Sequence, residues 1–171
     1  MTRFLPLVLA PVLTPILAPI LAIVLAAGAA NAEPLAPPAP KAALSGPDFL
    51  ARNAREPGVQ TLPSGLQYKV VTAAPAGASP KPGDIIKVHY EGKLVTGEVF
   101  DSSFDRGKPL IMPLGGLVPA WMEALPRMKV GDEWMLYAPP ELGYGSEAAG
   151  PIPANSVLIF RIKLLGLLSA D

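Results

Sequence analysis

Hydrophobic and polar residues alternate with a period of two through most of the chain after Gly65. Such alternation is typical of half-buried β-strands, and turn-forming residues bound each run. A single clear helix interrupts the pattern, from Pro119 to Leu125, where proline fits the first helical position. The expected strands are residues 65–72, 84–95, 98–103, 133–138 and 156–168. The pattern predicts an α+β fold in which an antiparallel sheet is covered by one short helix.

The last of these strands predicts where the core lies. Alternation places four apolar side chains on one of its faces: Leu158, Phe160, Ile162 and Leu164. The other face carries Val157, Ile159, Arg161 and Lys163. We expect the first face to pack on the predicted helix, which offers Trp121, Leu125 and Met128.

Residues 1–32 have the composition of a secretory signal peptide. No residue from Phe4 to Ala30 is charged, Arg3 places a positive charge before this run, and Ala30 begins a small-x-small cleavage motif. We expect cleavage after Ala32, which leaves a periplasmic or secreted protein without a stable membrane anchor. The apolar run is also long enough to span a bilayer, so an uncleaved anchor is the alternative.

Two further segments precede the main domain. Residues 33–47 are rich in proline and alanine, which predicts an extended tether. Residues 48–64 contain a short helix, with Asp48 as the N-cap candidate and a stop at Pro57, and lead into a domain at 65–171. Because this helix is short and no heptad repeat is evident, we expect a monomer.

Composition excludes several kinds of site. The 171 residues include 14 basic and 14 acidic ones, so no net charge favours nucleic acid as a partner. The chain has no cysteine and a single histidine, His89. These counts exclude a thiolate site, a thiol nucleophile and a multi-histidine metal site within one chain. We therefore expect no cofactor and no metal.

Residues 88–103 predict a β-hairpin with its two turn residues at 96–97. In that register Gly92 lies opposite Asp101, which leaves open space above the carboxylate. Tyr90 then lies diagonally across from Asp101 on the same face, within reach of it. The hairpin therefore predicts a single acid beside an aromatic ring.

Three side chains of this hairpin need separate interpretation. Alternation sends Phe100 away from Asp101, so the strand must bulge near residues 97–103 if both line one pocket. Asp101 either faces that pocket or only accepts hydrogen bonds from local backbone amides. His89 points away from Tyr90 by the same alternation, which favours a half-exposed surface residue over a general base.

Several stretches together resemble the FKBP-type peptidyl-prolyl isomerases, particularly the bacterial secreted members. They are SGLQY, VHYEGKLVTGEVFDSS, the helix around Trp121 with MKVGDEW behind it, the ELGYG loop and NSVLIFRIKLL. The resemblance runs from Gly65 to Leu168, and the element from Phe49 to Tyr68 is also typical of bacterial relatives. It implies a curved antiparallel sheet wrapped around a short helix, with an apolar pocket between them.

The resemblance also implies which residues form the pocket. Those expected to act in catalysis are Tyr90, Phe100, Asp101, Trp121, Tyr144 and Phe160. Those expected to contact substrate are Arg106, Met112, Leu117, Val118 and Ile152. Trp121 would form the floor, and Tyr90 and Arg106 would hold Asp101. The implied ligands are X-Pro segments of exported polypeptides and the inhibitors tacrolimus and rapamycin.

Three departures from the family pattern bear on substrate preference more than on fold. Leu110 and Met112 stand where the best-known small member has aromatic residues, and segments 109–121 and 145–155 are slightly short. Two other functions stay open: a chaperone that binds clients in the same pocket without catalysis, and a merely structural domain. The aromatic residues gathered around Asp101 argue against the structural domain.

Overall fold

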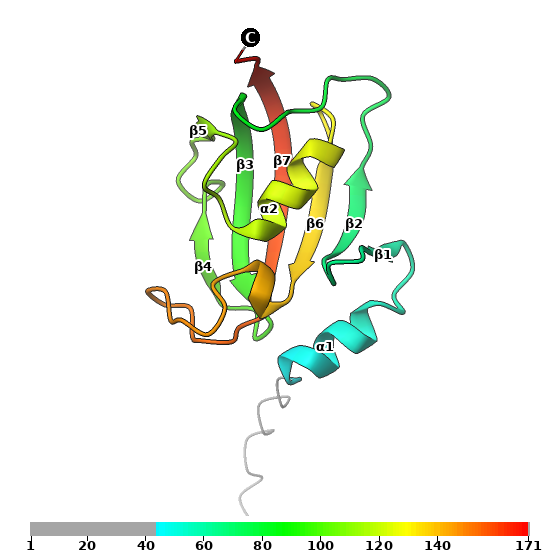
Figure 1. The fold of residues 1–171 in the computed structure, drawn as a ribbon, viewed down its shortest axis with the longest axis vertical. Coiled ribbons are helices and arrows are strands. Elements are labelled where there is room, and N and C mark those ends of the chain that lie inside the picture. The colour runs from blue at the N-terminus through cyan, green and yellow to red at the C-terminus, as the bar shows by residue number, and fades with distance from the viewer. Residues whose placement is uncertain (1–43, 171) are drawn as a thin grey trace, which may run out of the picture. The chain divides into compact units, whose positions relative to one another are not determined.

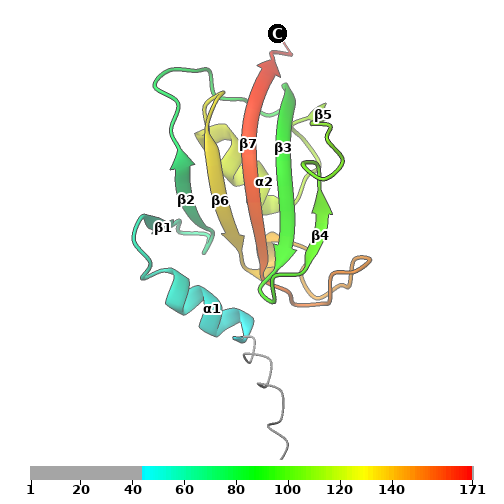
Figure 2. The same ribbon diagram turned by 180° about the vertical axis from the view of Figure 1, so that it is seen from behind.

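The structure is a computed structural model that describes residues 44–170, so the expected signal peptide and most of the tether lie outside the described residues. Within this range α2 lies against one face of an antiparallel sheet (Figure 1). The view from behind shows the other face of the sheet, with α2 beyond it (Figure 2). The predicted α+β class is confirmed.

The sheet contains seven strands in the order β1-β2-β6-β7-β3-β4, and β5 also pairs with β3. The strands are β1 (Val59–Thr61), β2 (Gln67–Thr72), β3 (Ile85–Leu94), β4 (Val99–Ser102), β5 (Leu110–Pro113), β6 (Glu133–Ala138) and β7 (Leu158–Leu168). The helices are α1 (Gly46–Asn53) and α2 (Pro119–Ala124), with single 3-10 turns at η1 (Leu125–Arg127) and η2 (Pro140–Leu142). All pairings are antiparallel.

Each strand predicted from alternation is present, but β1 and β5 were not predicted. β1 has three residues and β5 has four, which is too short for a period of two to stand out from a loop. Proline flanks β5 at Pro109 and ends it at Pro113, and proline within a run argues against a strand. β5 nevertheless forms because its residues pair with Ile85 to Val88 of β3.

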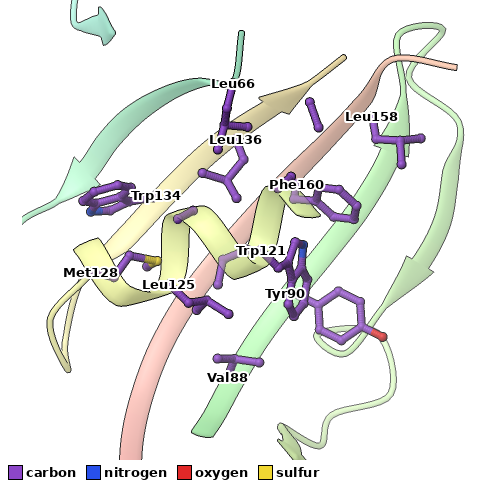
Figure 3. Packing of buried hydrophobic residues seen from close by; sticks show 14 of the residues in the cluster. Leu66, Val88, Tyr90, Trp121, Leu125, Met128, Trp134, Leu136, Leu158 and Phe160 are labelled. Atoms are coloured by element: carbon purple, nitrogen blue, oxygen red, sulfur yellow. The ribbon is translucent and has the colours of Figure 1, made fainter. Parts of the chain in front are cut away.

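The core lies between α2 and the inner face of β7, as expected. Leu158, Phe160, Ile162 and Leu164 are all buried, and so are Trp121, Leu125 and Met128. Figure 3 shows Leu158 and Phe160 of β7 together with Trp121, Leu125 and Met128 around α2. Burying one large apolar side chain contributes about 1.5–3 kcal/mol, so this layer supplies much of the driving force for folding.

The outer face of β7 is less exposed than alternation predicts. Val157, just before the strand, and Ile159 are also buried. Part of the cover is α1, because Gly46 approaches Val157 so closely that a methyl group on Gly46 would lie 2.8 Å from the Val157 Cγ2 atom. The helix is therefore packed onto the sheet instead of being a free lead-in.

α1 begins at Gly46, three residues before the start that an N-cap at Asp48 implies, and Asp48 is not its N-cap. Ser45 is the N-cap, and its hydroxyl donates to the Asp48 carboxylate at 2.6 Å. Asp48 is the third residue of the helix, and its backbone amide donates to the Ser45 hydroxyl oxygen at 3.4 Å, the usual N-cap hydrogen bond. A buried hydrogen bond of 2.8 Å from Asn53 to Gln67 ties the helix end to β2. Neither this helix nor any other in residues 44–170 is long and apolar enough to cross a membrane.

Candidate active site

The β3–β4 hairpin has a three-residue loop, not the predicted two-residue turn. The Leu94 amide donates to the Glu98 carbonyl at 2.8 Å, and the Gly97 amide donates to the Leu94 carbonyl at 2.9 Å. Gly97 has φ of 93°, the left-handed conformation that ends a three-residue hairpin loop. Such a loop alone would bring Gly92 opposite Phe100.

A bulge at Phe100 changes that register. Lys93 pairs with Val99, but Gly92 pairs with Asp101, so Phe100 is the extra residue in β4. The bulge that the pocket requires is therefore present, and it restores the predicted pairing of Gly92 with Asp101. It also lets Phe100 and Asp101, neighbours in sequence, both line one pocket.

Asp101 is held by two side chains. Its Oδ2 atom accepts a hydrogen bond from the Tyr90 hydroxyl, and its Oδ1 atom accepts one from Nη1 of Arg106. Arg106 also donates through Nη2 to the Tyr90 oxygen at 3.1 Å, which closes a triangle of three polar groups. The structure thus places both Tyr90 and Arg106 at Asp101, as the resemblance implied.

This triangle fixes the charges of the site. Burial on its own would raise the pKa of Asp101, but hydrogen bonds from Tyr90 and Arg106 outweigh it and hold that pKa below its ordinary value. Burial, together with the bond to Asp101, raises the pKa of Tyr90. At neutral pH Asp101 is therefore ionised and Tyr90 keeps its proton.

The triangle lies at one side of an apolar pocket with a volume of about 290 Å³. Ten of its lining residues were named from the sequence: Tyr90, Phe100, Asp101, Leu110, Met112, Leu117, Val118, Trp121, Tyr144 and Phe160. Gly116 completes the lining. Gly116 was not predicted, because a residue without a side chain leaves no signal of a pocket wall in the sequence.

The aromatic rings pack edge to face around Trp121. The centroid of its ring lies 5.2 Å from that of Tyr90 and 5.6 Å from that of Phe160, and both of those rings are nearly perpendicular to it. Figure 3 shows these three side chains together beside α2. Phe100 makes a similar contact with Phe160 at 5.9 Å. Edge-to-face packing fixes the rings beyond what burial alone provides, so the pocket is shaped before any ligand enters.

Tyr144 has a different setting from the other aromatics. It lies in the loop after η2 and is 44% exposed, whereas Trp121 is 5% exposed. The loop is braced by the Gly145 amide, which donates to the Pro140 carbonyl at 2.8 Å. The Tyr144 hydroxyl has no partner among the hydrogen bonds of the described residues. It therefore stands at the pocket rim, free to meet a ligand.

Two predicted substrate-binding residues do not line the pocket. Arg106 reaches it only through Asp101 and Tyr90. Ile152 is 4% exposed and belongs to the hydrophobic core, where its backbone forms a small bridge with Ala149. A direct contact of either residue with substrate stays a prediction.

His89 lies on the opposite face from the pocket, as alternation predicts. Its ring stacks on Phe104 at 4.8 Å, and its Nδ1 atom lies 2.9 Å from the hydroxyl oxygen of Ser103. That buried hydroxyl accepts the Tyr90 amide hydrogen bond at 2.7 Å. Sequence analysis missed Ser103, whose hydroxyl holds the backbone of Tyr90 on the side away from the pocket.

Among residues 44–170 no cluster of His, Cys, Asp and Glu could hold a metal ion.

Comparison with known proteins identifies two matching family descriptions. Residues 77–165 match "FKBP-type peptidyl-prolyl cis-trans isomerase". Residues 26–70 match "Domain amino terminal to FKBP-type peptidyl-prolyl isomerase". The second match spans the tether and α1, so the upstream element is also shared with relatives.

Individual relatives agree with these matches. The FKBP-type isomerase FkpA of Aeromonas hydrophila is 47% identical over 71% of this chain and 45% of its own length. The isomerase Mip of Coxiella burnetii is 48% identical over 70% of this chain and 52% of its own. The crystal structure of FkpA from Escherichia coli superposes with a TM-score of 0.71 at 41% identity, covering 74% of this chain and 59% of that one. The chain spans about half the length of the curated relatives it matches.

Proposed function

Because the chain belongs to the FKBP-type peptidyl-prolyl cis-trans isomerases, we propose that it catalyses rotation about X-Pro peptide bonds. The observation that carries this proposal is the pocket itself. Its floor and sides are aromatic and aliphatic, and its one ionised acid is already paired with an arginine and a tyrosine. Such a site suits a reaction that needs a shaped apolar environment.

The isomerisation of an X-Pro bond does not require a nucleophile. Rotation of a peptide bond faces a barrier of ~18–20 kcal/mol because it breaks amide resonance. An X-Pro bond populates both isomers, yet exchange takes roughly tens to hundreds of seconds. An isomerase must therefore bind the twisted amide better than the planar one. No covalent bond is made or broken.

The apolar lining supports that difference in binding. The planar amide has a strong dipole that water solvates well, whereas the twisted amide has lost conjugation and part of that polarity. Moving the bond into a pocket floored by Trp121, between Phe100 and Phe160, thus disfavours the planar form more than the twisted one. The proline ring would lie over Trp121.

Two polar groups would orient the substrate. The Tyr144 hydroxyl at the rim would donate a hydrogen bond to a substrate carbonyl. Asp101, held ionised by its pairing with Arg106, would meet the positive edge of the displaced carbonyl without exchanging a proton. Met112, Leu117 and Val118 would contact the residue before proline, because they form the aliphatic wall of the pocket.

The partners and place of action follow from the same proposal. The signal-like segment at residues 1–32 supports action in the periplasm or outside the cell, on exported proteins as they fold. Mass spectrometry of the exported protein should find Glu33 at its N-terminus, and a membrane-retained chain starting at Met1 would refute cleavage. Tacrolimus and rapamycin are the inhibitors to try first. Light scattering should find a monomer.

An alternative is a chaperone that holds clients in this pocket without turning over X-Pro bonds. The exposed rim residue Tyr144 and the 44% exposed Val99 on β4 offer such a client an apolar surface. Both functions predict binding of proline peptides. Only an isomerase would accelerate cis-trans exchange of the X-Pro bond when the peptide is in molar excess over the protein.

Magnetisation-exchange NMR on a short X-Pro peptide separates the two. We expect a catalytic amount of the chain to raise the cis-trans exchange rate, and tacrolimus to abolish the increase. Unchanged exchange at concentrations where the peptide binds would reject catalysis in favour of the client-binding module.

A further inference from the structure

Gly92 does not line the pocket itself, but it lies on β3 between two residues that do. On β3 it pairs with Asp101 of β4 on one side and with Phe160 of β7 on the other. Both neighbours line the pocket, so a side chain at position 92 would point toward the same space. The sequence alone predicted open space there.

That space is filled by the ring of Phe100. A methyl group added to Gly92 would lie 2.5 Å from both Cε2 and Cζ of Phe100, and 3.2 Å from Cε1 of Phe160. A separation of 2.5 Å is far inside ordinary van der Waals contact. The end of the Phe100 ring therefore occupies the volume that any other residue at position 92 would use.

Backbone conformation does not explain this glycine. Gly92 is absent from the residues with positive φ, whereas Gly97 in the loop has φ of 93°. A strand interior with ordinary φ accepts alanine, and glycine there weakens the strand. What requires glycine at position 92 is the close approach of the Phe100 ring, because any other residue would place a Cβ atom inside the van der Waals surface of that ring.

We propose that Gly92 is a positioning residue that seats the Phe100 ring and so sets the width of the proline subsite. The bulge turns Phe100 out of register, and its ring packs over the strand at Gly92. The Phe160 ring lies nearly perpendicular to it, with the ring centroids 5.9 Å apart. A larger residue at position 92 displaces the ring into the space for proline. The inference rests on the proposed isomerase function, because it assigns Gly92 a role in that reaction.

A double-mutant cycle tests the link between the two residues. Gly92→Ala should lower kcat/KM for an X-Pro peptide about tenfold, because ring displacement of even 1 Å spoils a preorganised site. Phe100→Leu removes Cε2 and Cζ but keeps an apolar side chain. In that background Gly92→Ala should cost less than about twofold.

The control is Gly166→Ala on β7, where an added methyl group meets nothing within 4 Å. It should leave kcat/KM unchanged, which separates the ring effect from a general effect of alanine in the sheet. Equal losses from Gly92→Ala in the wild-type and Phe100→Leu backgrounds would overturn the proposal.

A second readout does not depend on activity. In the wild-type chain, nuclear Overhauser contacts should link the outer Phe100 ring protons to the Gly92 α protons, and Gly92→Ala should change the contacts of those ring protons with the Phe160 ring while the core contacts of Leu136 persist. Absence of these contacts in the wild type would overturn the seating of the ring. A wild-type chain that shows the contacts but does not accelerate exchange would reject the isomerase function instead.

Discussion

The hydroxyl of Tyr90 donates a hydrogen bond to Oδ2 of Asp101 from the adjacent strand of the hairpin. The same Tyr90 ring packs nearly perpendicular to the Trp121 ring, with the ring centroids 5.2 Å apart. One side chain therefore connects the ionised acid of the pocket to its aromatic floor. Substitutions that spare this connection should affect the reaction without unfolding the protein.

Asp101→Asn should fold normally, because the Asp101 side chain is 41% exposed and an amide oxygen still accepts from Tyr90. It should lower kcat/KM by roughly threefold to thirtyfold, about 0.7–2 kcal/mol of transition-state binding. Peptide exchange kinetics and thermal unfolding on the same samples check this. Wild-type kcat/KM in the variant would remove the carboxylate charge from the mechanism.

Tyr144→Phe removes only the hydroxyl at the rim. We expect a similar fall in kcat/KM, roughly threefold to thirtyfold, with no change in stability, since the residue is 44% exposed and its hydroxyl has no partner among the hydrogen bonds of residues 44–170. Tyr68→Phe is the matched control, because the Tyr68 hydroxyl bonds Gln60 and lies outside the pocket lining. If the two variants have equal activity, the Tyr144 hydroxyl plays no part.

Trp121→Ala should impair both folding and catalysis. The side chain is 5% exposed and contacts Tyr90 and Phe160, so its loss should cost ~3–5 kcal/mol of unfolding free energy. Trp134→Ala offers a control of the same kind, since Trp134 is 6% exposed but outside the pocket lining. Denaturant unfolding should show both losses, whereas kcat/KM per folded molecule should fall only for Trp121→Ala.

The sequence predicted the sheet, the helix and the inner face of β7 because long alternating runs report burial directly. The prediction failed where a single residue changes the pairing register of two strands, as it does between β3 and β4. The two-residue turn at 96–97 was wrong, yet Gly92 still pairs with Asp101, since the longer loop and the Phe100 bulge each add one residue and cancel. A sequence shows neither addition separately.

Other differences have the same origin in contacts between distant segments. The position of α1 on Val157 depends on Gly46, which is 111 positions away in the sequence (157 − 46). Ser103 was expected only as the last residue of a strand, but its hydroxyl also accepts from the Tyr90 amide and donates to the Tyr90 carbonyl. Such contacts carry no local pattern, so only the folded chain shows them.

Activity should be nearly independent of pH from about 6 to 9, because none of the three polar groups of the triangle titrates there. The pKa of Asp101 lies below its ordinary value, so the ionised form persists until the pH drops below ~3.9. The raised pKa of Tyr90 keeps its proton in place past ~10.

The lowered pKa of Asp101 also makes the free energy of unfolding depend on pH. Because the Asp101 pKa is lower in the folded state, the contribution of Asp101 to stability is present above the unfolded pKa and disappears as pH falls through the folded pKa.

The predicted pH independence of activity is checked by measuring kcat/KM across the pH range, and again with His89→Gln. A bell-shaped profile that this substitution abolishes would place the single histidine in the mechanism.

The central claim is that the pocket accelerates rotation through its environment and transfers no proton. The solvent isotope effect on kcat/KM tests this most directly, with one X-Pro peptide compared in light and heavy water at matched acidity. We predict nearly equal rates once the uncatalysed exchange in each solvent is subtracted. A catalysed rate markedly slower in heavy water would contradict the account, because it would show a proton moving in the rate-determining step.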